Sequence, residues 1–251
     1  MIPGINPNIS VDCVIFGFDL KQLNVLLVER VYQSNLSQKP LFTDHTLIGN
    51  HILEHEDLEV AARRILKELT GVEDIYLEQF AALAHPERLK KEKDQIWLQH
   101  IGHNPSNRVI TVGYFGLMDV YSMQIRSPGD TGSPARSVSW FPVDKLPVLA
   151  FDHAEILNQA ILSLRTRMRL STIGYLLLPK KFSLSQLQTL FEVIHGIRLD
   201  KRNFRKKMGR LKYLIPLNEK QSNVSHKPAQ LYMFSRDVYE MTKGDFFENI
   251  I

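Results

Sequence analysis

The stretch GNHILEHEDLEVAARRILKELTGV, residues 49–72, decides the fold of the first part of the chain. Within it, four apolar residues recur at spacings of four, three and four: Leu58, Ala62, Ile65 and Leu69. This spacing predicts one buried stripe of a helix. Gly71 follows the stripe and is suited to a helix C-cap, because glycine adopts left-handed backbone angles without a steric penalty. We therefore predict one amphipathic helix that ends at Gly71.

Runs rich in β-forming residues flank this helix on both sides. Residues 11–18 and 25–31, joined by a polar turn, predict a hairpin, and Thr46 to Ile48 continues the sheet. Further strands are predicted at 75–83, 109–120 and 138–141. Residues 84–108 between them are predicted to form a long polar loop, and loops of that length are usually functional or mobile. A helix from Asp152 to about Met168 then leads into the rest of the chain.

The second part of the chain has the pattern of helices followed by a two-stranded wing. A short apolar helix is predicted at 172–178. Ser183 and Gln186 form a capping box for a second helix that Gly196 closes, and Asp200 is a suitable N-cap for a third helix over residues 201–212. Two strands follow at 213–217 and 230–234. This order predicts a winged helix-turn-helix.

The net charge of +4 is the sum of two unlike parts of the chain. Residues 165–251 contain 17 basic and 7 acidic residues, a net +10, whereas residues 1–164 contain 14 basic and 20 acidic residues, a net −6. A basic third of a chain usually faces a polyanion. The split therefore argues against a single uniform enzyme domain.

Composition excludes several other classes of protein. With 44% hydrophobic and 9% aromatic residues, the chain can form packed cores, so disorder is excluded as its main state. No apolar run approaches the roughly 18 residues of a membrane span, and the start of the chain lacks a secretory pattern, so we expect a cytoplasmic protein. Cys13 lies in an apolar run and is expected to be buried. No Cys/His cluster has zinc-ligand spacing, and we expect no metal or cofactor.

The third helix of the second part is strongly basic. Residues 198–212 include eight basic residues and one acid. Arg202 and Lys206 lie on the face opposite Phe204, with Asn203 and Arg210 beside them. Arg202, Asn203 and Lys206 are near the helix N-terminus, where they can reach base edges. Lys201 and Arg205 are placed for phosphates. Wing candidates for phosphate or minor-groove contacts are Lys220, His226 and Lys227. The alternative is a solvated charged face.

Residues 49–72 resemble a Nudix box, whose pattern is G-x5-E-x7-R-E-U-x-E-E-x-G-U, with U an apolar residue. The residues that match are Glu56, Arg64, Leu66, Glu68, Gly71 and Val72. Asn50 replaces the glycine, and Ile65 and Leu69 replace two glutamates that hold divalent metal in active Nudix hydrolases. A magnesium site depends on hard oxygen ligands, and these two side chains offer none. We expect Ile65 and Leu69 to fill the core or to form the apolar wall of a pocket, and Arg64 and Glu56 to form an ion pair between loop and helix.

The resemblance extends over nearly the whole chain, to the Nudix-related transcriptional regulators. It rests also on residues 11–31, 138–147, 149–157 and 199–207. It implies an α+β protein: a Nudix-like α/β/α sandwich with a mixed sheet over residues 1–168, including a linker helix 152–168, and a winged helix-turn-helix over 169–251. In that family the Nudix domain senses an effector, and the winged helix binds operator DNA as a homodimer. Some members sense ADP-ribose, and a branch with degraded boxes senses sugars; this sequence looks closest to the arabinose-responsive regulators.

We therefore expect a ligand-responsive repressor that a small effector, most simply a sugar such as L-arabinose, releases from double-stranded operator DNA. ADP-ribose is the less favoured effector, and the sequence leaves the sign of regulation open. Candidate effector-binding residues are Asp12, Arg30, Asn50, His51, Glu56 and Glu68. Two alternatives stay open: an active hydrolase of ADP-ribose-like nucleotides with a nucleic-acid-binding module, and a DNA-binding or scaffold protein without a ligand.

Overall fold

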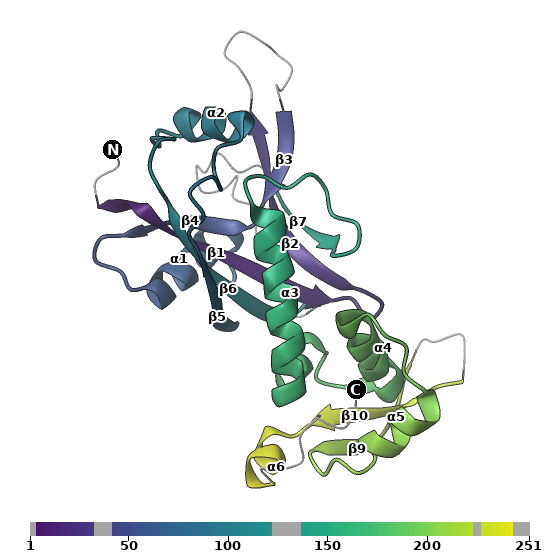
Figure 1. The fold of residues 1–251 in the computed structure, drawn as a ribbon. Coiled ribbons are helices and arrows are strands. Elements are labelled where there is room, and N and C mark those ends of the chain that lie inside the picture. Colours follow the sequence, from purple (N-terminus) through teal and green to yellow (C-terminus); the bar gives the residue numbers. More distant parts are fainter. Residues whose placement is uncertain (1–3, 33–41, 122–136, 223–226, 243–251) are drawn as a thin grey trace. The chain divides into compact units, whose positions relative to one another are not determined.

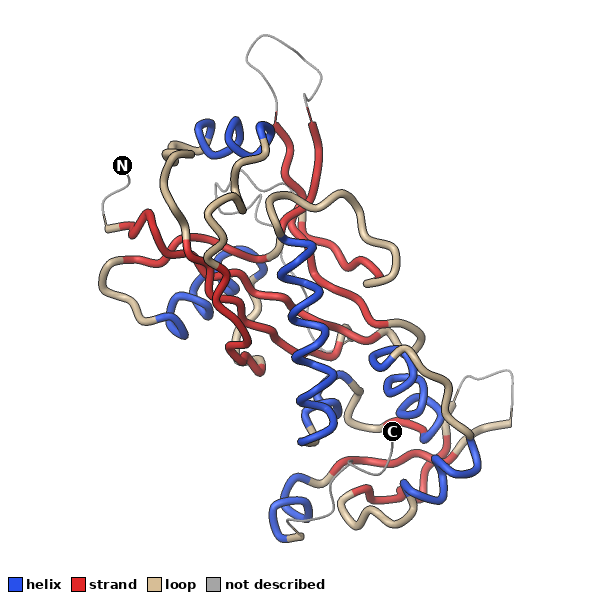
Figure 2. Tube along the Cα trace, viewed as in Figure 1, coloured by secondary structure: helices blue, strands red, loops and turns tan. Residues whose placement is uncertain are grey.

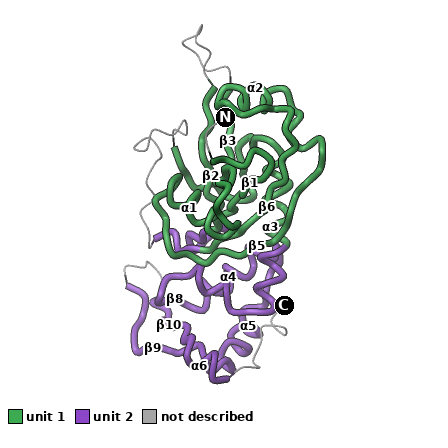
Figure 3. Tube along the Cα trace, turned by 90° about the vertical axis from the view of Figure 1, so that its left-hand side faces the viewer, with its two compact units in different colours: residues 1–16, 24–117, 123–162 green, residues 17–23, 118–122, 163–251 purple. Residues whose placement is uncertain are grey.

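The computed structural model describes residues 4–32, 42–121, 137–222 and 227–242 (Figure 1). The chain forms two compact units (Figure 3). The first contains residues 1–16, 24–117 and 123–162, and the second contains residues 17–23, 118–122 and 163–251. In the described ranges, every helix is too short or too polar to cross a membrane.

A seven-stranded sheet forms the centre of the first unit (Figure 2). The strands that the structure describes in it are β1 (Ile5–Phe18), β2 (Leu23–Tyr32), β3 (Phe42–Thr46), β4 (Ile48–Leu53), β5 (Tyr76–Leu83), β6 (Ile110–Asp119) and β7 (Val138–Pro142). Their order is β3-β2-β1-β6-β5, with β4 paired to β1 and β7 paired to β2. The predicted hairpin is confirmed as β1 and β2, which are neighbours in the sheet.

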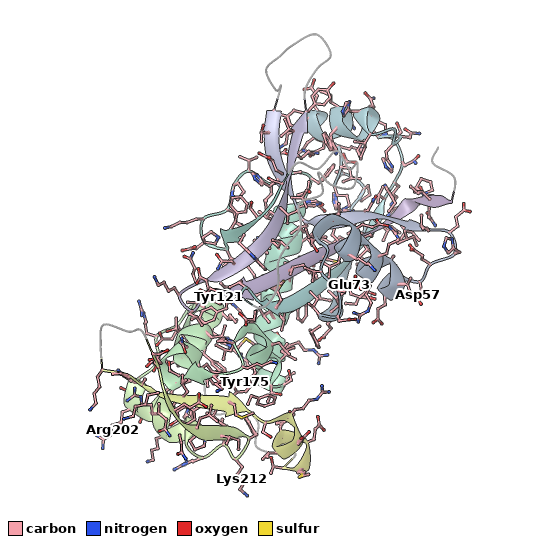
Figure 4. The ribbon with its side chains drawn as sticks, turned by 180° about the vertical axis from the view of Figure 1, so that it is seen from behind. Asp57, Glu73, Tyr121, Tyr175, Arg202 and Lys212 are labelled. Atoms are coloured by element: carbon pink, nitrogen blue, oxygen red, sulfur yellow. The ribbon has the colours of Figure 1, made fainter. Side chains whose placement is uncertain are left out.

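Helices cover both faces of this sheet. Helix α1 (Leu58–Thr70) lies on one face and α3 (His153–Leu170) crosses the other, as the views from opposite sides agree (Figures 1 and 4). Asp57 caps α1 by accepting a hydrogen bond from the backbone N–H of Val60, and Gly71 ends it with φ 70°. The predicted helix and its glycine cap are therefore confirmed.

The predicted loop over residues 84–108 is wrong in its central part, which forms helix α2 (Glu92–His100). The buried residues of this helix are Asp94, Trp97 and Leu98. They have helical spacing, but one of them is an aspartate, so the apolar stripe that would reveal the helix is interrupted. Lys91, at the N-cap, makes no side-chain capping bond, which removes the second sequence signal.

The second unit contains the predicted helices and wing. Its elements beyond the end of α3 are η2 (Ile173–Leu177, a 3₁₀ helix), β8 (Phe182–Ser183), α4 (Leu184–His195), α5 (Lys201–Met208), β9 (Leu214–Lys220), β10 (Gln230–Phe234) and α6 (Arg236–Met241). The capping box of Ser183 and Gln186 is present, and Gly196 ends α4 with φ 68°. Strands β8, β10 and β9 form a small sheet in that order, and β9 and β10 are the wing. The predicted fold class, a layered α+β domain followed by a winged helix, is confirmed.

Helix α5 is shorter than predicted, since it ends at Met208 and not at Lys212. Gly209 follows Met208, and glycine costs about 1 kcal/mol relative to alanine inside a helix. The backbone N–H groups of Arg210 and Leu211 then donate three residues back, to Lys207 and Met208, in turns. Arg210 therefore follows the helix.

Candidate functional site

A cavity of about 340 Å³ lies in the first unit. Its lining comes from strands β1 to β4 and β6, from α1, from α2 and the segments on either side of it, and from residues at and just before the start of α3. Cavities of 300–1,000 Å³ are typical of small-molecule sites. The polar groups that line it include two arginines and three histidines, and its walls include Trp97 and Phe151.

Arg30 is the most unusual of these lining residues, because its side chain is 2% exposed. It donates to both carboxylate oxygens of Asp44, each at 2.6 Å, and Nη2 also donates to Oδ1 of Asp94 at 2.7 Å. Burial raises the pKa of Asp44, but the hydrogen bonds from Arg30 and Lys93 outweigh that effect and hold it below its usual value. Two carboxylates thus compensate the buried guanidinium.

One nitrogen atom of this guanidinium differs from the other two in its hydrogen bonding. Nη1 of Arg30 is buried and has no hydrogen-bond partner among the described residues. Aromatic rings surround the guanidinium, with the ring centroids of Phe151 and Trp97 at 4.8 and 5.2 Å from Cζ. A buried donor without a partner costs about 1–3 kcal/mol, and more when it is charged. An acceptor on a bound molecule would remove this cost.

Arg88, the second arginine of the cavity, connects it to the start of α3. Nε and Nη2 donate to the two carboxylate oxygens of Asp152 at 2.8 and 2.9 Å. Nη1 donates to the hydroxyl of Thr111, which is 2.5 Å from the hydroxyl of Ser10. The cavity therefore presents a chain of hydroxyl and guanidinium groups.

Asp12 and His153 form a second polar pair in the cavity. Nδ1 of His153 accepts the backbone N–H of Leu47 at 3.0 Å, so the neutral ring carries its proton on Nε2, 3.8 Å from Oδ1 of Asp12. Burial lowers the pKa of His153, and the nearby carboxylate of Asp12 opposes this effect. A Cβ atom at Gly49 would lie 1.8 Å from Oδ1 of Asp12, so the carboxylate occupies space that only a glycine leaves open.

His51 and His103 stack in the same cavity, with ring centroids 4.6 Å apart and an interplanar angle of 19°. Nδ1 of His51 lies 3.1 Å from the carbonyl oxygen of Ile9. Burial lowers the pKa of both imidazoles, and each is neutral at pH 7. The pair offers a flat, uncharged surface beside the polar groups.

The residues of the degenerate motif on α1 divide between core and cavity. Ile65 is fully buried, whereas Leu69 lines the cavity, so the first fills the core and the second forms part of a pocket wall. Arg64 donates to both oxygens of Glu56, at 2.5 and 2.8 Å, and to Glu68 at 3.0 Å. The predicted loop-to-helix ion pair is confirmed, and the hydrogen bonds from Arg64 lower the pKa of Glu56. Within the described ranges, no group of three or more acidic, histidine or cysteine side chains is arranged to hold a metal ion.

A second candidate surface lies on α5 and the wing. Phe204 and Met208 are buried, and the cationic side chains point away from them. Figure 4 shows Arg202 projecting outward from the second unit. Among the residues described, Arg202, Arg205 and Lys206 form no ion pair with a carboxylate. Arg202, Arg205 and Lys206 therefore form an exposed array of positive charge on α5.

Comparison with known proteins identifies both parts. The NUDIX domain model matches residues 6–160, and the model of the NrtR DNA-binding winged helix domain matches residues 174–234. The chain belongs to the NrtR-like Nudix regulators. It is 31% identical over 242 residues to the ADPR responsive transcriptional repressor NtrR of Acinetobacter baylyi, a match that covers 94% of this chain and 85% of that relative.

Solved structures share this architecture. NrtR of Shewanella oneidensis, complexed with a 27mer DNA, superposes with a TM-score of 0.68 at 28% identity, covering 92% of this chain and 95% of the other. A MutT/nudix family protein of Enterococcus faecalis, at 22% identity, has a TM-score of 0.64 and covers 92% and 87% of the two chains. The comparisons give the expected arabinose effector no support, because the curated relative is named for its response to ADPR.

In this NrtR-like chain, the structure brings together four of the six predicted effector-binding residues. Asp12, Arg30, Asn50 and His51 line the cavity, whereas Glu56 and Glu68 are absent from its lining and pair with Arg64. Sequence reasoning missed several lining groups and one partner of Arg30: Arg88, Asp94, Trp97, Thr111, Phe151 and His153. Three of them lie within residues 84–108. The unusual length of this segment was the sequence signal that could have indicated a functional role for its residues.

The predicted DNA-contacting residues that the structure describes are all exposed: Lys201, Arg202, Asn203, Arg205, Lys206, Arg210, Lys220 and Lys227. His226 lies outside the described residues. Their roles, the domain boundary at 168/169 and the homodimer stay predictions.

Proposed function

We propose that this chain is a transcriptional repressor that grips operator DNA through α5 and the wing and releases it when ADP-ribose occupies the cavity. The name of the Acinetobacter relative and the DNA complex of the Shewanella protein support the two halves of this proposal. The observation that carries it is Arg30, which lines a cavity of ligand size and has in Nη1 a buried donor without a partner among the described residues. Two copies acting on a pseudo-palindromic site complete the proposal.

The walls of the cavity favour a nucleotide over a free pentose. Trp97 and Phe151 offer aromatic faces on which a base can stack, and the stacked pair of His51 and His103 adds a third flat surface. Arg88, Thr111 and Ser10 supply donors and acceptors for hydroxyl and phosphate oxygens. A pentose has no aromatic ring to stack on these faces.

We further propose that the chain binds this nucleotide without hydrolysing it. Ile65 and Leu69 stand where the Nudix motif has two metal-binding glutamates, and they offer no oxygen ligand. Glu68, the remaining carboxylate, is engaged by Arg64 at 3.0 Å. A single engaged carboxylate is a poor site for magnesium.

Calorimetry with ADP-ribose, AMP, ribose 5-phosphate and L-arabinose tests the effector. We expect saturable binding of ADP-ribose and none of L-arabinose, and a ligand at 100 times its Kd should stabilise the fold by about 2.7 kcal/mol. ADP-ribose should also release the protein from duplexes that it has selected out of a randomised pool. Release by L-arabinose alone would restore the sugar hypothesis.

The hydrolase alternative is tested by incubating the chain with ADP-ribose and Mg²⁺. We expect AMP to stay at the level of a protein-free control. The Leu69→Glu variant is the matched control, since Leu69 lines the cavity and the change restores a carboxylate at one motif position. Metal-dependent turnover by the wild type would contradict this part of the proposal.

A further inference from the structure

Phe151 lies two residues before His153, where helix α3 begins. Its backbone conformation is one that residues other than glycine rarely adopt. Its φ is 51°, in the left-handed region. For a bulky residue this is an outlier that persists only where surrounding contacts over-determine it, and such residues cluster at ligand sites and switches. Phe151 lies between a ligand-sized cavity and α3, and this position favours a role in a switch.

The contacts that hold Phe151 come from α2, from the N-cap residue of α2, and from Arg30. The backbone N–H of Phe151 donates to Oδ2 of Asp94 at 3.1 Å, and its carbonyl oxygen accepts from Nζ of Lys91 at 2.6 Å. Its ring centroid lies 4.8 Å from Cζ of Arg30. Both backbone polar groups and the ring are therefore fixed by cavity or near-cavity residues.

Asp94 joins the strained backbone of Phe151 to Arg30, which lines the cavity. One carboxylate oxygen accepts from Nη2 of Arg30 at 2.7 Å, and the other accepts from the backbone of Phe151. Asp94 is fully buried, so both bonds lie away from solvent screening. Two hydrogen bonds, from Arg30 to Asp94 and from Phe151 to Asp94, thus connect the guanidinium of a cavity residue to the backbone two residues before α3.

The two residues that follow Phe151 are also attached to cavity groups. Asp152 is held by Arg88, and His153 is held by the backbone of Leu47. From His153 the helix α3 is continuous to Leu170, and from Ser163 onward its residues belong to the second unit. A change of backbone conformation at Phe151 therefore acts on the start of a helix that contains residues of both units.

We propose that Phe151 is the switch residue through which the effector acts on α3. Effector bound against Arg30 and the Phe151 ring stabilises the left-handed conformation; without effector, Phe151 relaxes to ordinary backbone angles and α3 starts differently. The relaxed state is the one that binds DNA. This inference rests on the proposed function, and the effector can shift the balance only by binding the two states unequally.

Comparing Phe151→Gly with Phe151→Ala tests the switch, because both variants lose the ring and differ mainly in their tolerance of φ 51°. Glycine adopts the left-handed region freely, whereas for alanine it carries the steric penalty that corresponds to about a five- to thirtyfold population change. We expect the glycine variant to bind ADP-ribose tighter than the alanine variant by about that factor. Reciprocally, it should bind the selected duplex more weakly.

Calorimetry and gel shifts on the full chain separate the outcomes, with thermal melting to confirm that each variant folds. Wild-type binding of ADP-ribose together with equal affinities of the two variants would overturn the switch and leave the proposed function standing. If the wild type does not bind ADP-ribose, both the switch and the proposed function are overturned. Should neither variant fold, Lys91→Ala replaces them, because the Lys91 side chain is exposed and the change should leave the fold intact. Weaker binding of ADP-ribose by this variant supports the switch, and unchanged binding overturns it.

Discussion

The first unit buries its key arginine, whereas the second unit displays its arginines on the outside of a short helix. Arg30 is surrounded by two carboxylates and three aromatic rings, and only one of its nitrogen atoms is unpaired. Arg202 and Arg205 are exposed and, in the described part of the chain, have no carboxylate partner. The same side chain thus meets opposite environments in one protein.

This difference sets how each region recognises its partner. A compensated, buried guanidinium adds little net charge and selects a ligand by the position of a single acceptor. An exposed, uncompensated array attracts a polyanion over a distance, and salt screens that attraction. The first region therefore suits one small molecule, and the second suits a duplex.

The largest expected effect comes from removing the buried charge. Arg30→Met should leave Asp44 and Asp94 without their main partner and destabilise the fold by about 3–5 kcal/mol. Urea unfolding followed by circular dichroism measures this loss. The matched change on the other surface, Arg202→Met, should alter stability by less than about 0.5 kcal/mol. Equal losses of stability in the two variants would contradict the difference drawn between the buried and the exposed arginine.

A smaller effect is expected on DNA binding. Arg202→Ala should weaken binding to the selected duplex by about 1–3 kcal/mol if the side chain reads a base edge, while the melting temperature stays unchanged. Fluorescence anisotropy at several salt concentrations measures both the affinity and its salt dependence. Glu219→Gln, on the wing but acidic, is the control. Full affinity in the arginine variant would remove α5 from the interface.

The smallest effect concerns the contribution of His153, in the first unit, to the pH dependence of stability. Burial lowers the pKa of His153, so the folded chain binds fewer protons than the unfolded chain below its ordinary pKa of about 6.5, and stability falls as the pH falls. His153→Asn keeps an acceptor for the backbone of Leu47 and cannot titrate. Melting curves from pH 7.5 to 5 should therefore fall less steeply in this variant. A slope equal to that of the wild type would contradict the assignment.

Most of the fold could be predicted from the sequence, because its elements carry local signals. The stripe and glycine cap of α1 and the capping box of α4 are examples in which neighbouring residues suffice. Helix α2 could not be predicted, since its buried face includes Asp94, whose partner Arg30 lies 64 residues away. The cavity was predicted in part for the same reason: its polar groups pair across strands and helices, at distances that spacing along the chain does not encode.

Gly49 and Asp12 also constrain the order in which this chain can change. Because the carboxylate of Asp12 occupies the place of a Cβ atom at position 49, any side chain there becomes acceptable only after Asp12 has moved or been replaced. Asp12 can therefore be replaced while Gly49 stays, whereas the residues that position 49 accepts depend on what occupies position 12.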